Sequence, residues 1–279
     1  MKIKNTAILI ALLCNINLLS AQSLKTPAPS PLQTLKQDFA LSNIEVSYSR
    51  PGVKDRVIFG DIVPFGKVWR TGANAATTIT FGDTVIISGT KVSPGKYGLL
   101  TIPGQNEWTI IISRSTTTTG PEDYKQEEDV IRYTSKTVAL SPKMETFSIG
   151  FNNIRPTSCD LQMAWENTMV TLPISAEIDG KIMKDIQRYV INDNRPYSAA
   201  ANYYMENGKD LKQALEWFDK AIANNPKAYW TVHQKANCLA KMGMKKEAIE
   251  VANQSMKLAQ EDGDGHYVKL NEKLISTLK

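Results

Sequence analysis

Histidine is nearly absent from this sequence, which contains only two such residues, His233 and His266. Both lie in the C-terminal third of the chain. The preceding two thirds therefore cannot form a Ser-His-Asp or Cys-His catalytic arrangement, because both need an imidazole as the base. A zinc site there would also lack imidazole, and Cys159 alone cannot make one. The sequence predicts no catalytic residue, no metal site and no cofactor.

Cysteine is also scarce, with three residues in 279. One of them, Cys14, lies in a segment that we expect to be removed. A disulfide between Cys159 and Cys238 would join a predicted strand to a distant predicted helix, and the geometry of a disulfide is strict. An exported protein would permit this bond. Two unpaired, buried thiols are nevertheless the favoured prediction.

Charge of neither sign dominates the chain, whose 33 Lys and Arg against 28 Asp and Glu give a net charge of +5. No basic cluster or nucleic-acid-reading motif is present, so no nucleic-acid partner is predicted. A glycine-rich phosphate loop is also absent. Residues 262–266, Asp-Gly-Asp-Gly-His, resemble the start of a calcium loop. However, His266 and Lys273 stand where oxygen ligands are needed, which favours a loop between helices.

Long apolar runs are missing except near the N-terminus. There Lys2 and Lys4 precede a short apolar stretch at residues 7–13, and small residues follow. This pattern predicts a signal peptide over residues 1–21. Because a membrane-spanning helix needs about 20 apolar residues, the stretch is too short to be one. We expect an exported, soluble, periplasmic protein with no membrane span.

Residues 22–40 are rich in proline and are predicted to form a flexible leader. From there, residues 41–175 alternate between apolar and polar side chains with turn residues between short runs. This pattern predicts about eight or nine strands in an antiparallel β-sandwich. The sequence also predicts a two-residue hairpin at residues 82–83 and a fold-back at residues 166–167.

The pattern changes after residue 176, where Ile178, Ile182 and Ile186 fall on one face of a helix. Helical spacing continues to the C-terminus, so a second module is predicted over residues 177–279. The fold class is therefore expected to be mixed, with an antiparallel β-sandwich followed by an α-helical module.

Part of the helical module repeats. Ala214 and Phe218 are followed 34 residues later by Ala248 and Ala252, at matching offsets. Residues 195–279 thus resemble tetratricopeptide repeats, in which small residues let two helices pack closely. The resemblance implies helical hairpins that bind a protein or peptide partner along one face.

That face predicts a partner-binding site. Positions 230, 233, 237 and 241 lie on one side of a helix, and two residues occupy the matching places one repeat earlier. The alternative is that Trp230 packs between helices and the other side chains are solvated. The candidate partner-binding residues are Ser198, Asn202, Trp230, His233, Asn237 and Lys241.

The stretches SRPGVKDRVIFGDIVPFGKVWRTGANAATTITF, SPGKYGLLTIPGQNEWTIIIS and DVIRY resemble an exported bacterial family, domain of unknown function 2911. The resemblance covers residues 41–174, and the run Trp-Arg-Thr-Gly-Ala-Asn at 69–74 is its most specific signature. The family pattern continues with Glu where this chain has Ala75, so no carboxylate role is transferred to that position. The resemblance implies a fold and a place for a site, without a reaction.

The signature suggests two interpretations. Arg70 either pairs with an internal acid such as Asp129, with Asn74 in a tight turn, or grips an anionic or sugar ligand. Trp69 offers a stacking face in the second interpretation. The candidate ligand-binding residues are Arg50, Arg56, Trp69, Arg70, Asn74, Tyr124, Asp129 and Arg132.

The sequence therefore favours an exported, non-catalytic binding or scaffold protein of the cell envelope. The alternative is an envelope hydrolase, acting on carbohydrate, that uses the region rich in Arg and Trp for its substrate. Such an enzyme would need a pair of carboxylates, for example Glu107 with Asp129 or Glu122.

Overall fold

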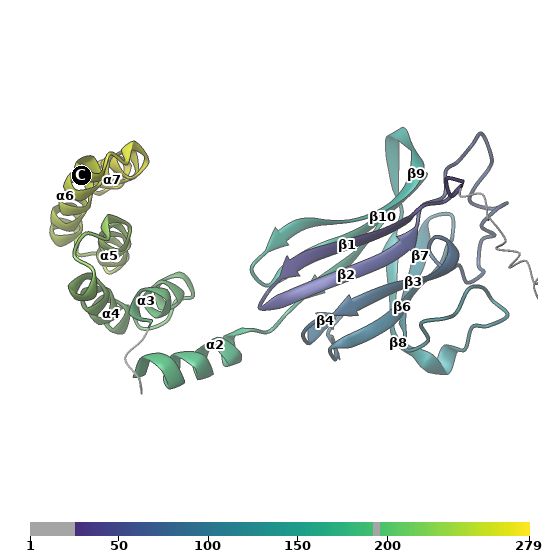
Figure 1. Ribbon diagram of the computed structural model, residues 1–279, viewed down its shortest axis with the longest axis horizontal. Helices are drawn as coiled ribbons and strands as arrows, with labels where there is room; N and C mark the ends of the chain where they lie inside the picture. The colour runs from purple at the N-terminus through teal and green to yellow at the C-terminus, as the bar shows by residue number, and fades with distance from the viewer. Residues whose placement is uncertain (1–25, 192–195) are drawn as a thin grey trace, which may run out of the picture. The chain divides into compact units, whose positions relative to one another are not determined.

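The computed structural model describes residues 26–191 and 196–279, which form two compact units divided between Glu177 and Ile178. The first unit is built of strands and the second of helices (Figure 1). The predicted mixed fold class is confirmed, since two antiparallel sheets precede the helices. The predicted signal peptide lies outside the described residues.

Six antiparallel strands form the larger sheet, in the order β1-β2-β3-β6-β7-β8 (Figure 1). Its apolar side chains face the core with the period of two that the sequence predicts. On β2, for example, Ile44, Val46 and Tyr48 are all buried. The strands are β1 (Leu32–Phe39), β2 (Ser42–Ser49), β3 (Ala73–Phe81), β6 (Gly95–Ile102), β7 (Glu107–Ser113) and β8 (Asp129–Lys136).

Four strands form the smaller sheet, in the order β5-β4-β10-β9. A hairpin joins β4 to β5 through Ser88 and Gly89, whose φ angles are 50° and 78°. Two consecutive positive φ angles match the right-handed twist of the strands that they connect. The strands are β4 (Val85–Ile87), β5 (Thr90–Val92), β9 (Val138–Arg155) and β10 (Ser158–Ser175).

The predicted flexible leader, residues 22–40, is wrong over its second half. Residues Leu32–Phe39 form β1, which pairs with β2 from Leu32 opposite Ser49 to Phe39 opposite Ser42. β1 is an edge strand, and only Phe39 in it is fully buried. A pattern with so little buried surface is hard to recognise from periodicity.

Two predicted turns are also wrong. Gly82 and Asp83 do not close a hairpin, because β3 and β4 on either side belong to different sheets. The pair Glu166-Asn167 does not reverse the chain either. β10 continues through it with register shifts on both sides, and Glu166 has φ 52°. An irregularity of this kind bends a strand without ending it.

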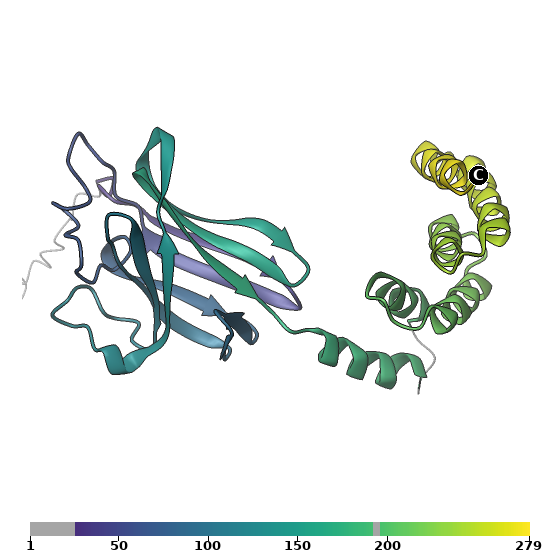
Figure 2. The ribbon, with the colours of Figure 1, turned by 180° about the vertical axis from the view of Figure 1, so that it is seen from behind.

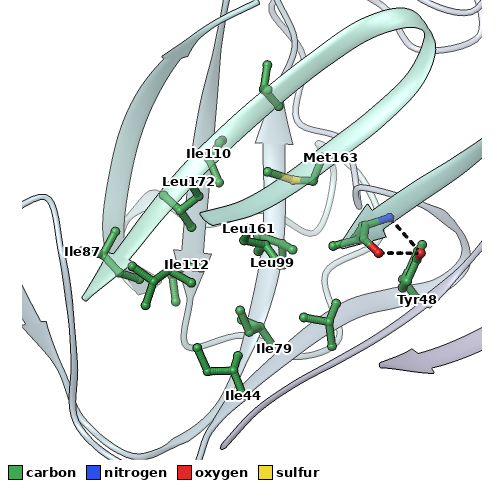
Figure 3. Packing of buried hydrophobic residues seen from close by; sticks show 14 of the residues in the cluster. Ile44, Tyr48, Ile79, Ile87, Leu99, Ile110, Ile112, Leu161, Met163 and Leu172 are labelled. Atoms are coloured by element: carbon green, nitrogen blue, oxygen red, sulfur yellow. Dashed lines mark hydrogen bonds between the residues drawn. The ribbon is translucent and has the colours of Figure 1, made fainter. Parts of the chain in front are cut away.

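The two sheets enclose one hydrophobic core (Figure 3). Ile79 and Leu99 of the larger sheet and Leu161 and Met163 of the smaller sheet have no exposed surface. Burying an aliphatic side chain of this size contributes about 1.5–3 kcal/mol. Packing between the two sheets therefore supplies the main stabilisation of this unit.

The outer edge of β9 is bonded to the end of β2 and to the segment after it. The Tyr48 hydroxyl accepts a hydrogen bond of 2.8 Å from the Ile149 backbone nitrogen and lies 3.2 Å from the Ile149 carbonyl oxygen (Figure 3). The Phe147 nitrogen donates to the Pro51 carbonyl at 2.9 Å, and Arg50 Nε donates to the Phe147 carbonyl at 3.0 Å. These bonds join the sheets along one side and occupy polar groups that an edge strand leaves unpaired.

The helices of the second unit follow one another as consecutive packed neighbours from α3 onward (Figure 2). A π-helical segment, Gln187–Ile191, extends α2. The carboxylates of Asp210 and Asp264 accept bonds from the first backbone N–H groups of α4 and α7, which fixes where those helices begin. The helices are α2 (Asp179–Ile186), α3 (Tyr197–Glu206), α4 (Leu211–Asn224), α5 (Tyr229–Lys241), α6 (Lys245–Asp262) and α7 (Gly265–Leu278).

The repeated small residues lie where helices pack. Ala214 and Phe218 on α4 and Ala248 and Ala252 on α6 have no exposed surface. Gly263, with φ 79°, ends α6, so a connection between helices is confirmed, but it spans only Gly263 and Asp264 and not all of residues 262–266. Glycine takes this left-handed conformation without the cost that a Cβ imposes.

The two cysteines of the described residues, Cys159 and Cys238, are buried and free, as predicted. Burial raises the pKa of the Cys159 thiol to about 11. No helix within residues 26–191 and 196–279 is both long and apolar enough to cross a membrane.

Candidate functional site

The signature run forms a strained turn at the start of β3. Thr71 and Asn74 have φ angles of 55° and 59°, a region that residues with a side chain rarely adopt. Hydrogen bonds compensate for this strain, since Thr71 Oγ1 lies 3.0 Å from Thr101 Oγ1 and Thr77 Oγ1 donates to the Thr71 carbonyl at 2.9 Å. All three threonines are buried. The run is thus a demanding turn, as one of the two interpretations requires.

Trp69 packs inside the unit. Its ring is stacked on Trp165 with centroids 5.8 Å apart, and it makes edge contacts with Phe59, Trp108 and Phe147. Its Nε1 donates to the Gly72 carbonyl at 3.0 Å, which ties the ring to the turn. One face of the ring that was predicted to stack on a ligand is therefore occupied by Trp165.

A pocket of about 470 Å³ opens beside the signature run. One wall is the segment that leads into β3, and the other is part of the connection between β7 and β8. Backbone bonds hold the first wall against β6, because Trp69 and Thr101 exchange two bonds of 2.7 and 3.0 Å. The pocket is lined by Ile62, Val63, Pro64, Lys67, Val68, Trp69, Arg70, Thr119, Gly120, Pro121 and Glu122.

The pocket carries two cationic side chains and one carboxylate. Among the described residues, neither Lys67 nor Arg70 forms an ion pair. Arg70 Nη1 donates to the Asn74 carbonyl, which leaves the other donors of its guanidinium for a ligand. Glu122 is the carboxylate of the lining. Two cations against one carboxylate favour an anionic ligand, because a guanidinium and an ammonium both bind carboxylate or phosphate.

Sequence reasoning did not select Lys67 as a candidate, although it lies two residues before the signature. The other wall, residues 119–122, lies in a connection without alternation, so no pattern marked it. A useful signal was the length of that connection, because long connections often carry binding residues.

Arg50 and Arg56 lie outside the pocket lining. Arg50 bonds to β9, as described above, and its role is to join the sheets. Arg56 donates to the carbonyls of Gly52 and Val53 at 2.8 and 3.0 Å, so it fixes its own loop. Both side chains are therefore used by the fold.

Asn74 also has a partner within the unit. Its Nδ2 donates to the Ser30 carbonyl at 3.1 Å, which fastens the segment before β1 to the signature turn.

The predicted pair of Arg70 with Asp129 is not formed. Asp129 Oδ2 instead accepts bonds from the Tyr124 hydroxyl at 2.5 Å and from Arg132 Nη1 at 2.7 Å, and its side chain is 5% exposed. Burial and the Asp129 carboxylate raise the pKa of Tyr124 to about 12. The bond to Asp129 also raises the pKa of Arg132.

This cluster of Tyr124, Asp129 and Arg132 anchors the second wall of the pocket. Tyr124 follows the tight turn at residues 120–123, and its bond to Asp129 fastens that turn to the first residue of β8. None of the three lines the pocket. Asp129 Oδ1 is buried without a hydrogen-bond partner among the described residues. The structure therefore places these predicted ligand residues in a supporting position.

One pair of carboxylates considered for hydrolysis, Glu107 and Asp129, lies far apart. On the paired strands β7 and β8, Glu107 lies opposite Lys136, whereas Asp129 lies opposite Ser113. Six residues of strand separate the two positions, which is about 20 Å. The two catalytic carboxylates of a glycoside hydrolase are at most about 9.5 Å apart. Glu107 and Asp129 cannot form such a pair.

The predicted partner face divides between exposed and buried positions. Trp230 is 46% exposed, and Lys241 is exposed with its Nζ 3.1 Å from the Met205 carbonyl. Ser198, Asn202 and Asn237 are half-buried. The Oδ1 atom of Asn202 is buried with no partner among the described residues.

His233 does not belong to an exposed face. It is 7% exposed, and its Nδ1 lies 2.7 Å from Asn271 Oδ1. Asn271 Nδ2 donates in turn to Ser255 Oγ at 2.9 Å, and Ser255 Oγ donates to the Tyr229 carbonyl at 2.8 Å. This buried chain joins α5, α6 and α7. His233 is therefore part of the helix packing, and the expectation that it faces a partner is corrected.

The described residues contain no group of three or more His, Cys, Asp or Glu side chains arranged to hold a metal ion. A comparison with curated proteins found no relative that matches this chain. A family model described as a protein of unknown function, DUF2911, matches residues 30–174, which include both sheets up to the end of β10 and more than half of the chain. On this match, the chain belongs to the DUF2911 family.

Proposed function

We propose that this protein is a non-catalytic binding protein whose β unit takes a small anionic ligand in the pocket beside the signature run. The observation that carries the proposal is the lining itself. Lys67 and Arg70 present cationic groups without an ion pair among the described residues, in a pocket that Thr119 also lines. The volume, about 470 Å³, falls in the range of small-molecule sites.

Titration calorimetry of the full chain with inorganic phosphate and with butanoate tests this proposal. Lys67→Gln should weaken binding of both anions by about tenfold, and binding should weaken further as salt is added, because the charges are exposed. Lys36→Gln, on an exposed position of β1, is the matched control and should bind as the wild type does. Equal affinities of Lys67→Gln and the wild type would contradict the proposal.

Binding of neutral sugars is a second test, because a ligand rich in hydroxyl groups can also form hydrogen bonds with Thr119, Glu122 and Arg70. Sugar binding that survives Lys67→Gln would favour a carbohydrate over an anion. The hydrolase alternative is not favoured. Among the described residues, Glu122 is the one carboxylate that lines the pocket, whereas a glycoside hydrolase uses two.

For the helical unit we infer a peptide or protein partner, in keeping with its resemblance to tetratricopeptide repeats. The exposed ring of Trp230 and the unpartnered Oδ1 atom of Asn202 support this. The double variant Asn237→Ala/Lys241→Ala should weaken capture from a library of synthetic peptides, while the melting temperature stays nearly unchanged. Lys246→Ala, on the exposed side of α6, is the control. If capture is unchanged and stability falls strongly, Asn237 and Lys241 stabilise the fold and do not bind the partner.

The location that we propose is the periplasm, after removal of residues 1–21. The basis is the N-terminal pattern of Lys2 and Lys4 before an apolar stretch. Sequencing of the mature N-terminus tests it, with Gln22 as the expected first residue. An intact leader on the protein isolated from the periplasm would contradict the cleavage.

A further inference from the structure

The loop that forms the first wall of the pocket exposes apolar side chains to solvent. Val57, Ile62 and Phe65 are 63%, 48% and 38% exposed. We refer to these three residues as the apolar rim. A contiguous exposed apolar patch is typical of a binding surface, and these three side chains belong to one short segment, residues 57–65.

The backbone of this loop fixes which side chains face outward. The Val63 nitrogen donates to the Ile58 carbonyl at 2.9 Å, and both of these side chains are buried in the core. One position earlier in each of these two segments, the Ile62 nitrogen lies 3.5 Å from the Val57 carbonyl oxygen. The side chains of Ile62 and Val57 are exposed. The inward pair holds the loop in place, so the outward pair is presented by a fixed backbone.

Phe65 is held in the same loop. A Cβ atom built on Gly60 would lie 2.9 Å from the Phe65 ring, so this ring covers a glycine whose φ is 95°. A side chain at position 60 would displace Phe65. The geometry requires glycine there, and the exposed ring is a built part of the loop.

Ile62 connects the apolar rim to the pocket, because it belongs to the rim and also lines the pocket. Val68 and Pro121 add further apolar groups to the lining, which also holds Lys67 and Arg70. The pocket lining therefore combines two cationic groups, Lys67 and Arg70, with the exposed aliphatic side chain of Ile62, which belongs to the apolar rim.

We propose that the ligand of this pocket is an anionic amphiphile. Its acid group is bound by Lys67 and Arg70, and its alkyl chain lies along Ile62 and the apolar rim. This inference rests on the proposed function, since it names the class of the same ligand. Such a ligand complements both the cationic groups and the exposed apolar groups. A free inorganic anion complements only the cationic groups.

The test compares butanoate with octanoate, which share one carboxylate and differ by four methylenes. Each fully buried methylene raises affinity about fourfold, and a half-buried one about twofold. Octanoate should therefore bind the full chain about 15-fold more tightly than butanoate. Octylammonium, with the same chain and the opposite charge, should bind at least tenfold more weakly than octanoate.

Two variants test where the alkyl chain of the ligand binds. Ile62→Ser should reduce the ratio of the octanoate to the butanoate affinity to about threefold or less. Val138→Ser removes a residue that is 50% exposed and outside the pocket lining, and it should keep the full ratio. A ratio near one in the wild type, or a ratio that Ile62→Ser leaves unchanged, overturns the inference.

The result also separates this inference from the proposal on which it rests. If butanoate and phosphate bind through Lys67 but chain length has no effect, anion binding stands and the amphiphile is refuted. If no anion binds, the proposed function fails as well. Melting temperatures of each variant without ligand show whether a loss of binding reflects misfolding.

The amphiphile could be a free acid or a lipid in a bilayer, and vesicles distinguish these sources. Phosphatidylcholine vesicles with and without phosphatidylglycerol are sedimented with the full chain. Sedimentation that needs the anionic lipid and is lost in Ile62→Ser and in Lys67→Gln identifies a bilayer lipid. Octanoate binding without sedimentation identifies a free acid. Sedimentation that both variants retain, together with a ratio near one, overturns the inference for both sources.

Discussion

The bond between Tyr48 and β9 allows a quantitative test of how the two sheets are joined. The Tyr48 ring is 1% exposed, and its hydroxyl bonds to the backbone nitrogen of Ile149 and to Gln33 Oε1, each at 2.8 Å. Tyr48→Phe removes the hydroxyl oxygen and keeps the ring. The contacts of the ring with the core, including its edge contact with Phe147, remain available.

The cost follows from the groups that lose a partner. The Ile149 N–H donates to the Tyr48 hydroxyl in a buried position, and a buried donor left unsatisfied costs about 1–3 kcal/mol. The donation from the hydroxyl adds about 1 kcal/mol. We therefore expect a loss of about 2–4 kcal/mol in the free energy of unfolding. For a unit of this size that is about 5–15 °C in melting temperature.

Thermal unfolding of the full chain, followed by the near-ultraviolet circular dichroism of its aromatic residues, measures this loss. Tyr133→Phe on β8 is the matched control, because the Tyr133 hydroxyl makes no hydrogen bond within the described residues, and it should melt as the wild type does. Amide exchange at Ile149 gives a local readout and should accelerate in Tyr48→Phe. A change of less than about 0.5 kcal/mol, with protection at Ile149 retained, would refute the reasoning that this hydroxyl joins the sheets.

Two further predictions concern the signature turn and the supporting cluster. Gly72→Ala should lower the free energy of unfolding by about 1–3 kcal/mol, measured by urea denaturation, because the new Cβ would lie 2.9 Å from Thr77 Oγ1 and 3.0 Å from the Ser49 carbonyl oxygen. Unchanged stability would show that the turn can move. The pKa of Tyr124 is raised to about 12, so the folded state keeps this proton where the unfolded state loses it, and the stabilisation present below pH 10 should disappear as the pH rises from 10 to 12. A difference titration of tyrosinate absorbance against Tyr124→Phe measures this pKa. Asp129→Asn should lower it, and an unchanged pKa in that variant would contradict the assigned cause.

The fold could be predicted from the sequence where alternation is strong and failed where it is weak. On β2 the buried residues occur at every second position, so the strand is evident. On β1 only Phe39 is fully buried and Leu32 is 68% exposed, because the strand lies at an edge of the sheet. Gly82-Asp83 failed for another reason. The dipeptide is typical of a hairpin, but local sequence does not show whether the next strand joins the same sheet or the opposite one.

The site could be located but not assembled from the sequence. The signature run predicted a demanding turn and a place for a ligand, and the pocket does lie beside it. The pairing of Arg70 with Asp129 was wrong, since Asp129 had nearer partners in Tyr124 and Arg132, five and three residues away. Contacts between segments distant in the sequence depend on how strands are ordered in the sheets. Spacing along the chain does not specify that order.

The geometry of the signature run also determines which residue can report on ligand binding. Thr71 and Asn74 hold the turn, and the same turn places Trp69 in the aromatic cluster and Arg70 at the pocket. A change at any of these four positions alters the fold and the pocket together, so loss of binding in such a variant has two explanations. Lys67 is different, because its side chain is exposed and makes no ion pair or hydrogen bond within the described residues. Its charge can be removed without a cost to the turn, and the effect on binding then measures the pocket alone.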